Sequence, residues 1–140
     1  MNLQLITLEG IKVDHEIYEA TIPTAAGEIG VFPGHEPLVT LAEPGVIQIR
    51  YSRDDSDEKL DYYAISGGIV TITPAGIRIL VDEADSGEDI VESESQAALE
   101  RAIEMRNNAS SQVELEQAHE LMDRHAVRLK VAGLRRRYRR

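Results

Sequence analysis

Histidine and carboxylate side chains are the groups in this sequence that could bind a metal ion, and their spacing argues against such a site. Two helical ligands on one face need a separation of three or four residues, whereas His119 and His125 are six apart. His15 and His35 are distant from one another, and His35 with Glu36 could supply two ligands but no third. Since zinc sites use three or four protein ligands, we expect no bound metal.

Catalytic side chains are equally hard to place. The carboxylates between Arg53 and Glu58 lie in a polar stretch typical of a solvent-exposed turn, and nothing brings two carboxylates into an apolar pocket. The run Ser66-Gly67-Gly68 lacks the lysine and the spacing of a phosphate-binding loop. Cysteine is absent, which excludes disulfides, thiol catalysis and cysteine-bound zinc. The residues therefore offer no catalytic constellation.

Charge is divided unevenly along the chain. The formal net charge of −10 combines −12 over residues 1–90 with +2 over residues 91–140. The acidic part should repel nucleic acid and anionic lipid. The run from Arg135 to Arg140 could bind nucleic acid, favour the negative end of a helix macrodipole, or contact an acidic protein partner. Because the rest of the chain is so acidic, we expect no nucleic-acid partner.

The first part of the chain, up to about Ala84, has the pattern of short β-strands. Its apolar runs alternate with polar residues, are rich in β-branched and aromatic side chains, and are separated by glycine, proline and aspartate. The turn Thr73-Pro74-Ala75-Gly76 suits a hairpin. Many short strands without a helical crossover predict an N-terminal antiparallel β-sandwich or barrel over residues 1–85. The expected strands are Leu3–Leu8, Ile17–Pro23, Val46–Arg50, Leu60–Ile65, Ile69–Ile72 and Ile77–Val81.

After residues 82–87 the apolar period becomes helical. The stretch Asn107–Ser110 separates two helices, which predicts a C-terminal antiparallel helix-turn-helix hairpin over residues 93–140, after a linker at 86–92. The helical faces are rich in alanine, which buries little area, so we expect a weakly held hairpin that a few kcal/mol of competing contact could move. The residues at helical spacing are Ala97, Ala98, Ala102 and Ile103, then Leu115, Ala118, Met122, Ala126 and Leu129.

Two serine positions suggest where the helices begin. Ser93 with Gln96, and Ser111 with Glu114, have the spacing of capping boxes. In such a box the serine hydroxyl and the later side chain each accept a hydrogen bond from the other's backbone.

Membrane and export segments are not evident. No apolar run approaches the roughly 20 residues that a membrane-spanning helix needs. The stretch from Met1 to Leu5 lacks a basic region followed by an apolar one, so we expect no secretory signal and no direct membrane insertion.

Three stretches resemble the epsilon subunit family of F-type ATP synthases. They are Gly27–Thr40 (GEIGVFPGHEPLVT), Ala64–Ile72 followed by Ile79–Ala84, and the helical tail that ends in Arg128–Gly133. Their order and spacing, and the length of the chain, agree with the family throughout. The resemblance implies a flattened N-terminal β-sandwich and a C-terminal helical hairpin.

The resemblance also implies a role. Such subunits sit at the foot of the central stalk, bind the gamma subunit and the c-subunit ring, and couple ion-driven rotation of the ring to ATP synthesis in the alpha/beta catalytic head. In many members the hairpin inhibits ATP hydrolysis, and the catalytic residues lie on other subunits. A member would be a non-enzymatic peripheral protein on the cytoplasmic face of the cell (inner) membrane. The alternative interpretation is a free-standing β-sandwich protein-binding module unrelated to ATP synthase.

In the first stretch, the resemblance implies that Glu28, Gly30, Phe32 and His35 contact the membrane ring. From the residues alone, a plain hairpin with glycine-proline turns is the commoner interpretation. Its glycines would let the loop approach another backbone closely.

Some members bind ATP through an Ile/Leu-Asp-x-x-Arg-Ala motif at the start of the first helix. The corresponding run here is Ile90–Ser95, in which Val91 replaces the acid, Glu94 the arginine and Ser95 the alanine. A carboxylate in place of the arginine should repel phosphates. We therefore expect little or no ATP binding to the hairpin, and no cofactor.

Basic residues of the second helix are the expected regulatory contacts. The resemblance implies that they pair with acidic loops of the catalytic head when the hairpin extends, where arginine forms strong bidentate contacts with carboxylates. The sequence leaves both a compact and an extended resting state open. The residues are Arg124, Arg128, Arg135, Arg136 and Arg137.

Overall fold

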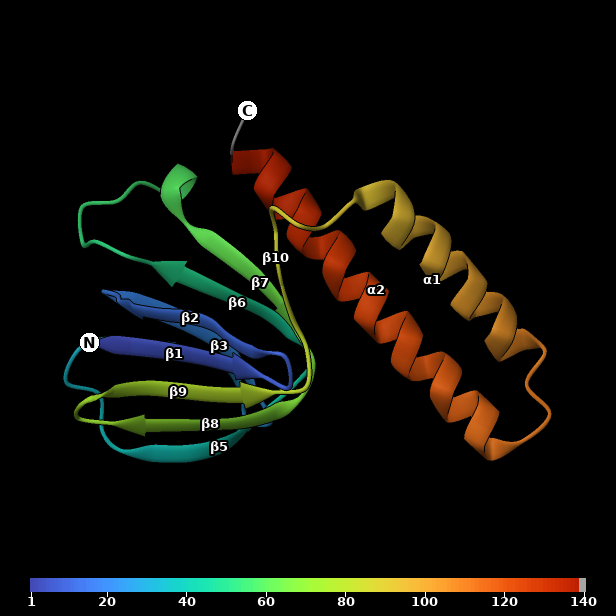
Figure 1. Cartoon of the computed structure of the whole chain (residues 1–140), viewed down its shortest axis with the longest axis horizontal. Coiled ribbons are helices and arrows are strands. Elements are labelled where there is room, and N and C mark those ends of the chain that lie inside the picture. The colour runs from blue at the N-terminus through green and yellow to red at the C-terminus, as the bar shows by residue number, and fades with distance from the viewer. Residues whose placement is uncertain (139–140) are drawn as a thin grey trace.

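Ten β-strands followed by two α-helices make up the computed structural model, which describes the backbone of residues 1–138 and the side chains of residues 1–135 (Figure 1). A 3₁₀ turn, η1 (Asp57–Lys59), precedes β7, and the helices are α1 (Glu92–Asn107) and α2 (Gln112–Tyr138). The strands are β1 (Asn2–Thr7), β2 (Gly10–Glu16), β3 (Glu19–Thr24), β4 (Gly27–Val31), β5 (Leu38–Ala42), β6 (Gly45–Arg50), β7 (Asp61–Ile65), β8 (Gly68–Thr73), β9 (Gly76–Val81) and β10 (Ala84–Ser86).

The strands form two packed layers. One has the order β10-β7-β6-β3 with β4 paired to β3, and the other has the order β5-β8-β9-β1-β2. β3 joins β5 only through the pair Thr24–Ala42, so the sheet turns a corner there. The predicted β-sandwich is confirmed. Within the described residues β1 and β9 pair in parallel, whereas the other strand pairs are antiparallel.

Alternation along the strands fills the space between the layers. β1 buries Leu3 and Leu5 while the residues between them point outward, and β9 does the same with Ile77 and Ile79. Side chains from both layers interdigitate in this core, which makes the sandwich a stiff body. Its largest fully buried side chains are Leu3, Leu5, Ile22, Val31, Ile47, Ile49, Val70, Ile72 and Ile79.

Two glycines permit a close approach of neighbouring strands. The predicted turn before β9 ends at Gly76, whose φ is +151° and where a Cβ atom would lie 2.1 Å from the Asn2 carbonyl oxygen. At Gly68 a Cβ atom would lie 1.9 Å from the Leu80 carbonyl oxygen in β9. Gly68 of the run Ser66-Gly67-Gly68 is therefore required by strand packing.

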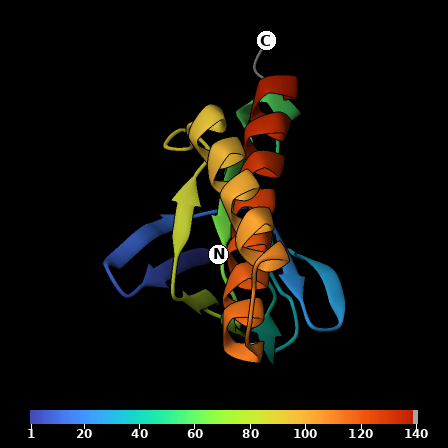
Figure 2. The ribbon, with the colours of Figure 1, turned by 90° about the vertical axis from the view of Figure 1, so that its right-hand side faces the viewer.

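The helices form the predicted antiparallel hairpin. α2 lies between α1 and the sandwich, and it contacts β7 and β6 (Figures 1 and 2). The expected linker, residues 86–92, contains the last residue of β10 and the first residue of α1.

The capping box predicted for α1 is wrong, and the one predicted for α2 is confirmed in part. α1 begins after Val91 with no side-chain capping bond, so the box predicted at Ser93 and Gln96 is wrong: both residues lie inside the helix. At α2, the Glu114 backbone N–H donates to Ser111 Oγ at 3.2 Å, as predicted. The Glu114 carboxylate, however, accepts bonds from the backbone N–H (2.8 Å) and hydroxyl (2.9 Å) of Ser110, which lower its pKa. The reciprocal half of the box is thus shifted by one residue.

Candidate functional site

A second, smaller core forms where α2 meets the sandwich, and we call this contact the helix–sandwich interface. On α2, Val127, Val131 and Leu134 follow an i, i+4, i+7 spacing and pack with Tyr62 of β7 and Ile90. Val131 is fully buried. The helical positions predicted from the sequence do not include this face, although its i, i+4, i+7 spacing was the signal that could have revealed it.

The apolar face that the sequence did predict is turned toward α1. Ala102 of α1 and Ala118 of α2 are fully buried between the helices, but Ala126 is exposed, contrary to prediction. Small side chains let the helices come close while burying little apolar area. The hairpin therefore depends on its contact with the sandwich as well as on its own seam.

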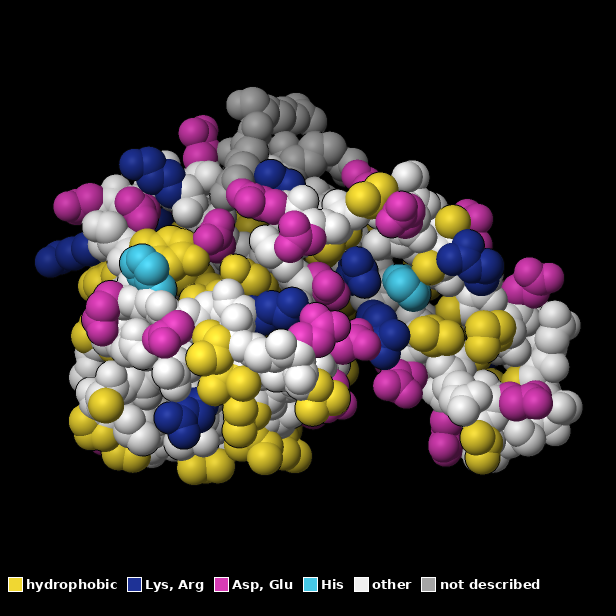
Figure 3. All heavy atoms as spheres, viewed as in Figure 1, with side chains coloured by type: hydrophobic (Ala, Val, Ile, Leu, Met, Phe, Trp, Pro, Cys, Tyr) yellow, Lys and Arg dark blue, Asp and Glu magenta, His cyan; other side chains and the backbone are white. Residues whose placement is uncertain are grey.

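Arginines flank the apolar part of the helix–sandwich interface. Arg124 Nε lies 3.1 Å from Glu83 Oε2, and an Arg128 terminal nitrogen lies 3.4 Å from Asp85 Oδ2. Arg135 donates to the Gly87 carbonyl oxygen at 3.2 Å and lies 3.9 Å from Glu88. We call these three arginine contacts the latch. Figure 3 shows Arg and Lys side chains meeting Asp and Glu side chains where the helices adjoin the sandwich.

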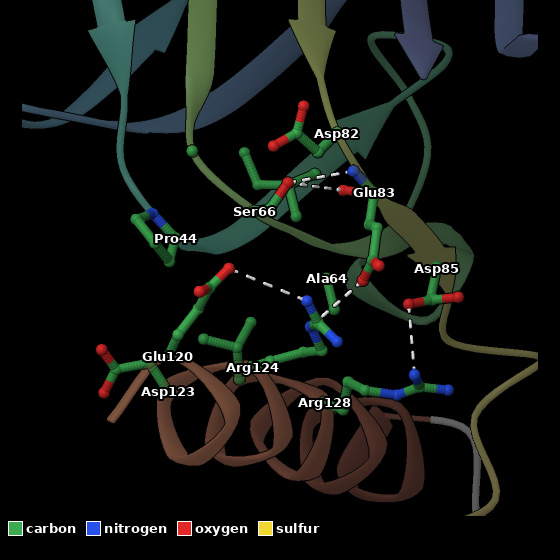
Figure 4. Close-up of a pocket in the computed structure, with 13 residues that line it drawn as sticks. Pro44, Ala64, Ser66, Asp82, Glu83, Asp85, Glu120, Asp123, Arg124 and Arg128 are labelled. Atoms are coloured by element: carbon green, nitrogen blue, oxygen red, sulfur yellow. Dashed lines mark hydrogen bonds and ion pairs between the residues drawn. The ribbon is translucent and has the colours of Figure 1, made fainter. Parts of the chain in front are cut away.

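The backbone fixes one carboxylate of the latch in place. The Glu83 N–H donates to Ser66 Oγ at 2.9 Å, and the Ser66 hydroxyl donates to the Glu83 carbonyl oxygen at 3.3 Å (Figure 4). The Ser66 backbone N–H donates to the same carbonyl oxygen at 3.1 Å. These bonds tie the segment after β9 to the end of β7, so the Glu83 side chain points at Arg124 without further ordering of the loop.

A hollow of about 350 Å³ remains between α2 and the sandwich beside the latch. Glu120 and Asp123 line it from α2 with Arg124 and Arg128 of the latch, and Asp82 lines it from the sandwich side (Figure 4). Glu120 Oε1 lies 3.9 Å from an Arg124 terminal nitrogen, but both residues belong to α2, so this pair does not tie the helix to the sandwich. The latch and the small apolar core therefore hold this contact.

The residues expected at the membrane ring lie elsewhere, along an edge strand. Glu28 and Gly30 are exposed on β4, which pairs with β3, and Phe32 and His35 follow the end of the strand. Phe32 makes an edge contact with the Tyr18 ring at 5.8 Å between centroids, and the His35 N–H donates to the Phe32 carbonyl oxygen at 3.1 Å. Glu28 and Gly30 thus lie on the strand, and Phe32 and His35 lie at the two ends of the turn that follows it.

The structure also places residues that were compared with the ATP motif. Glu94 and Arg101 line a hollow between the helices with Arg128, and Ser95 is buried. Arg136 and Arg137 lie outside the residues whose side chains the structure describes.

Among the described residues, no three His, Cys, Asp or Glu side chains converge on a possible metal position. No described helix is both long and apolar enough to cross a membrane.

Comparison with known proteins assigns the sandwich to a family. The sequence model described as "ATP synthase, Delta/Epsilon chain, beta-sandwich domain" matches residues 1–87. The ATP synthase epsilon chain of Herpetosiphon aurantiacus is 32% identical over 136 residues, covering 97% of this chain and 96% of that one. The ATP synthase epsilon chain of Rippkaea orientalis is 29% identical over 136 residues, covering 95% and 96%.

Solved structures share the architecture. A chain in the Euglena gracilis mitochondrial ATP synthase, OSCP/F1/c-ring in rotational state 1, gives a TM-score of 0.78 at 28% identity, covering 94% of this chain and 79% of that one. A chain in the central stalk/c-ring structure of the Tetrahymena thermophila mitochondrial ATP synthase gives 0.59 at 14% identity, covering 93% and 94%, which shows a shared fold alone.

Removing the latch carboxylates should loosen α2 without altering the helix itself. The double variant Glu83→Gln, Asp85→Asn keeps side-chain size and removes the ion pairs with Arg124 and Arg128. Such partly exposed pairs contribute about 0.2–1 kcal/mol each, so protection of α2 amides against hydrogen exchange should fall roughly twofold to thirtyfold.

The matched control is Glu58→Gln, Asp54→Asn, which makes the same two changes at exposed positions before β7. Neither residue lines a hollow beside the latch, so this control should leave α2 protection unchanged. Salt near 1 M, where the Debye length is about 3 Å, should weaken protection in the natural chain more than in the double variant. Equal protection in the double variant and the natural chain would contradict the latch.

Proposed function

This chain belongs to the ATP synthase delta/epsilon chain family, and we propose that it is a non-catalytic rotor subunit of the central stalk. In this role the sandwich binds the gamma subunit, the β4 edge contacts the c-subunit ring, and the hairpin restrains ATP hydrolysis by the alpha/beta head. Contacts with these proteins would hold it at the cytoplasmic face of the cell (inner) membrane. The observation that carries the proposal is the pairing of a stiff sandwich, matched over residues 1–87, with a hairpin held by a latch.

The outer face of the second layer carries an apolar row suited to a protein partner. Leu41, Ile69, Leu80 and Ile6 pair in register across β5, β8, β9 and β1, and Ile11 of β2 continues the row. Leu41 and Ile11 are each 59% exposed, Ile69 46% and Leu80 45%. Figure 3 shows hydrophobic side chains along the lower margin of the sandwich, where β5 and β8 lie in Figure 1. We infer that this row receives the gamma subunit, because contiguous exposed apolar surface marks binding sites.

Charges placed in this row should abolish tight binding of the gamma subunit. Burying one large apolar side chain contributes about 1.5–3 kcal/mol, so Leu41→Glu or Ile69→Glu should raise the dissociation constant more than about tenfold. The matched control is Leu8→Glu, at an 85% exposed position in the β1–β2 turn. Titration calorimetry with purified gamma subunit measures the effect, and equal affinities for all three variants would rule out this face.

The β4 edge is proposed to contact the polar loops of the membrane ring. Charge reversal by Glu28→Lys should weaken that contact and lower ion-driven ATP synthesis several-fold in membrane vesicles. Glu58→Lys, at the exposed η1 turn, makes the same change away from this edge and should have no effect. Full coupling in the Glu28→Lys vesicles would show that Glu28 contributes little.

The hairpin is proposed to regulate hydrolysis by exchanging one set of arginine contacts for another. In the compact form Arg124, Arg128 and Arg135 pair with the chain's own sandwich. On extension they would become available, with Arg136 and Arg137, to acidic loops of the catalytic head. The two sets compete for the same guanidinium groups, so strengthening the latch favours the active enzyme and weakening it favours inhibition.

The hairpin should not use ATP to stabilise its compact form. Glu94 lies beside Arg101 and Arg128, and its carboxylate would oppose a phosphate there. Millimolar ATP should leave the NMR spectrum and the melting temperature of the isolated chain unchanged, since a ligand stabilises only when its concentration is comparable with its Kd. The variant Val91→Asp, Glu94→Arg, Ser95→Ala, which restores the family motif, is the positive control. A micromolar Kd for the natural chain would contradict the prediction.

A further inference from the structure

His125 lies where α2, α1 and the sandwich meet. It stands on α2 between Arg124 and Arg128 of the latch. On the sandwich side it borders a hollow of about 270 Å³ that also reaches Glu83, and on the α1 side it borders a hollow of about 360 Å³ that reaches Arg101. A change of charge at His125 therefore acts on both contacts of α2 at once.

Charged groups from every neighbouring element surround these hollows. The ion pairs of the latch, and the Lys12–Glu9 pair at 3.3 Å, already engage most of the carboxylates. A positive charge at His125 would be repelled by the three nearby arginines. Carboxylates that are already paired would stabilise this charge only a little. The groups are Arg124 and Arg128 on α2, Glu94 and Arg101 on α1, Glu9 and Lys12 from the β1–β2 hairpin, and Asp82, Glu83 and Asp85 after β9.

The imidazole is placed to remain neutral in the compact form. Its Nδ1 atom is buried and has no hydrogen-bond partner among the residues that the structure describes. A neutral ring can carry its one proton on Nε2, whereas a protonated ring carries a proton on both nitrogens and would leave a buried donor unsatisfied. Burial, followed by Arg128, Arg124 and Arg101, lowers the pKa of His125, and Glu83 opposes them with a smaller effect.

We propose that His125 is a proton-sensitive release element, whose protonation detaches α2 from the sandwich. In a detached hairpin the ring meets water and titrates near the ordinary histidine pKa of about 6.5. The compact form holds the neutral ring, so its stability is fully present above that value. The stability is lost as pH falls from there toward the lowered pKa of the compact form.

Within the proposed rotor role, acidification around the hairpin would free the arginines for the catalytic head and strengthen inhibition of hydrolysis. That consequence rests on the proposed function. The conformational response is a property of this chain alone and can be measured without any partner.

Spin labels can report the response in the full-length chain, because it contains no natural cysteine. Ala75→Cys lies in the exposed β8–β9 turn and Val113→Cys at the exposed start of α2. Electron paramagnetic resonance should find one distance at about pH 7.5 and a growing second population toward about pH 5.5. The ratio of the two should change by up to about tenfold per pH unit between the two pKa values. In His125→Gln the compact distance should persist throughout.

Matched variants make the test decisive. His119→Gln removes an exposed histidine from the same helix and should keep the pH response of the natural chain. His125→Lys should populate the detached form already at pH 7.5, while NMR signals of strand amides show that the sandwich stays folded. Acid-induced opening of His125→Gln equal to that of the natural chain, or distances that do not change with pH, would overturn the proposal. If the natural chain did not bind the gamma subunit at pH 7.5 but still showed the pH response, the proposed function would be contradicted. The proposed role of His125 as a release element would then remain supported.

Discussion

The contact between one face of α2 and the acidic edge at residues 83–88 is the constraint on which the compact form depends. The sandwich is complete without the helices, since its two layers fill one another's inner faces. The hairpin has no comparable core, because alanine dominates the seam between α1 and α2. What keeps the hairpin beside the sandwich is a small apolar cluster flanked by three arginine contacts.

This division would suit the two duties of the proposed rotor role, torque transmission and regulation. A body that transmits torque must not deform, and a close-packed core of interlocked strands meets that need. A regulatory element must instead have two arrangements of similar free energy. Partly exposed ion pairs suit the second duty, because each contributes little and each can be exchanged for an equivalent pair on another protein. The uneven charge along the sequence thus produces an attraction between the acidic sandwich and the basic face of α2.

Much of the fold followed from residue patterns, and the site followed only in part. Alternation and turn residues located six of the ten described strands but not β2, β4, β5 and β10, and the helical period located the hairpin. The parallel pairing of β1 with β9 could not be read, because register between distant strands is set by the assembled sheet. The Val127–Val131 face was overlooked because its spacing overlaps that of the alanine stripe. The first capping box failed because Val91, an extended residue without a capping side chain, is the residue that precedes α1. The ring-facing role of Glu28 and its neighbours stays a prediction.

The latch also explains why a reversed charge at Glu94 is compatible with a compact hairpin. A guanidinium that is paired with a carboxylate of its own chain has less to gain from an added phosphate. Arg124 and Arg128 are paired in this way with Glu83 and Asp85, and Glu94 adds negative charge near Arg101 on the α1 side. The anions that could neutralise the basic helix face are therefore built into the chain. We propose that this hairpin, which supplies its own anions, closes without a nucleotide. Its closure should then respond to salt, protons or a competing acidic surface, since each of these alters the balance of charges.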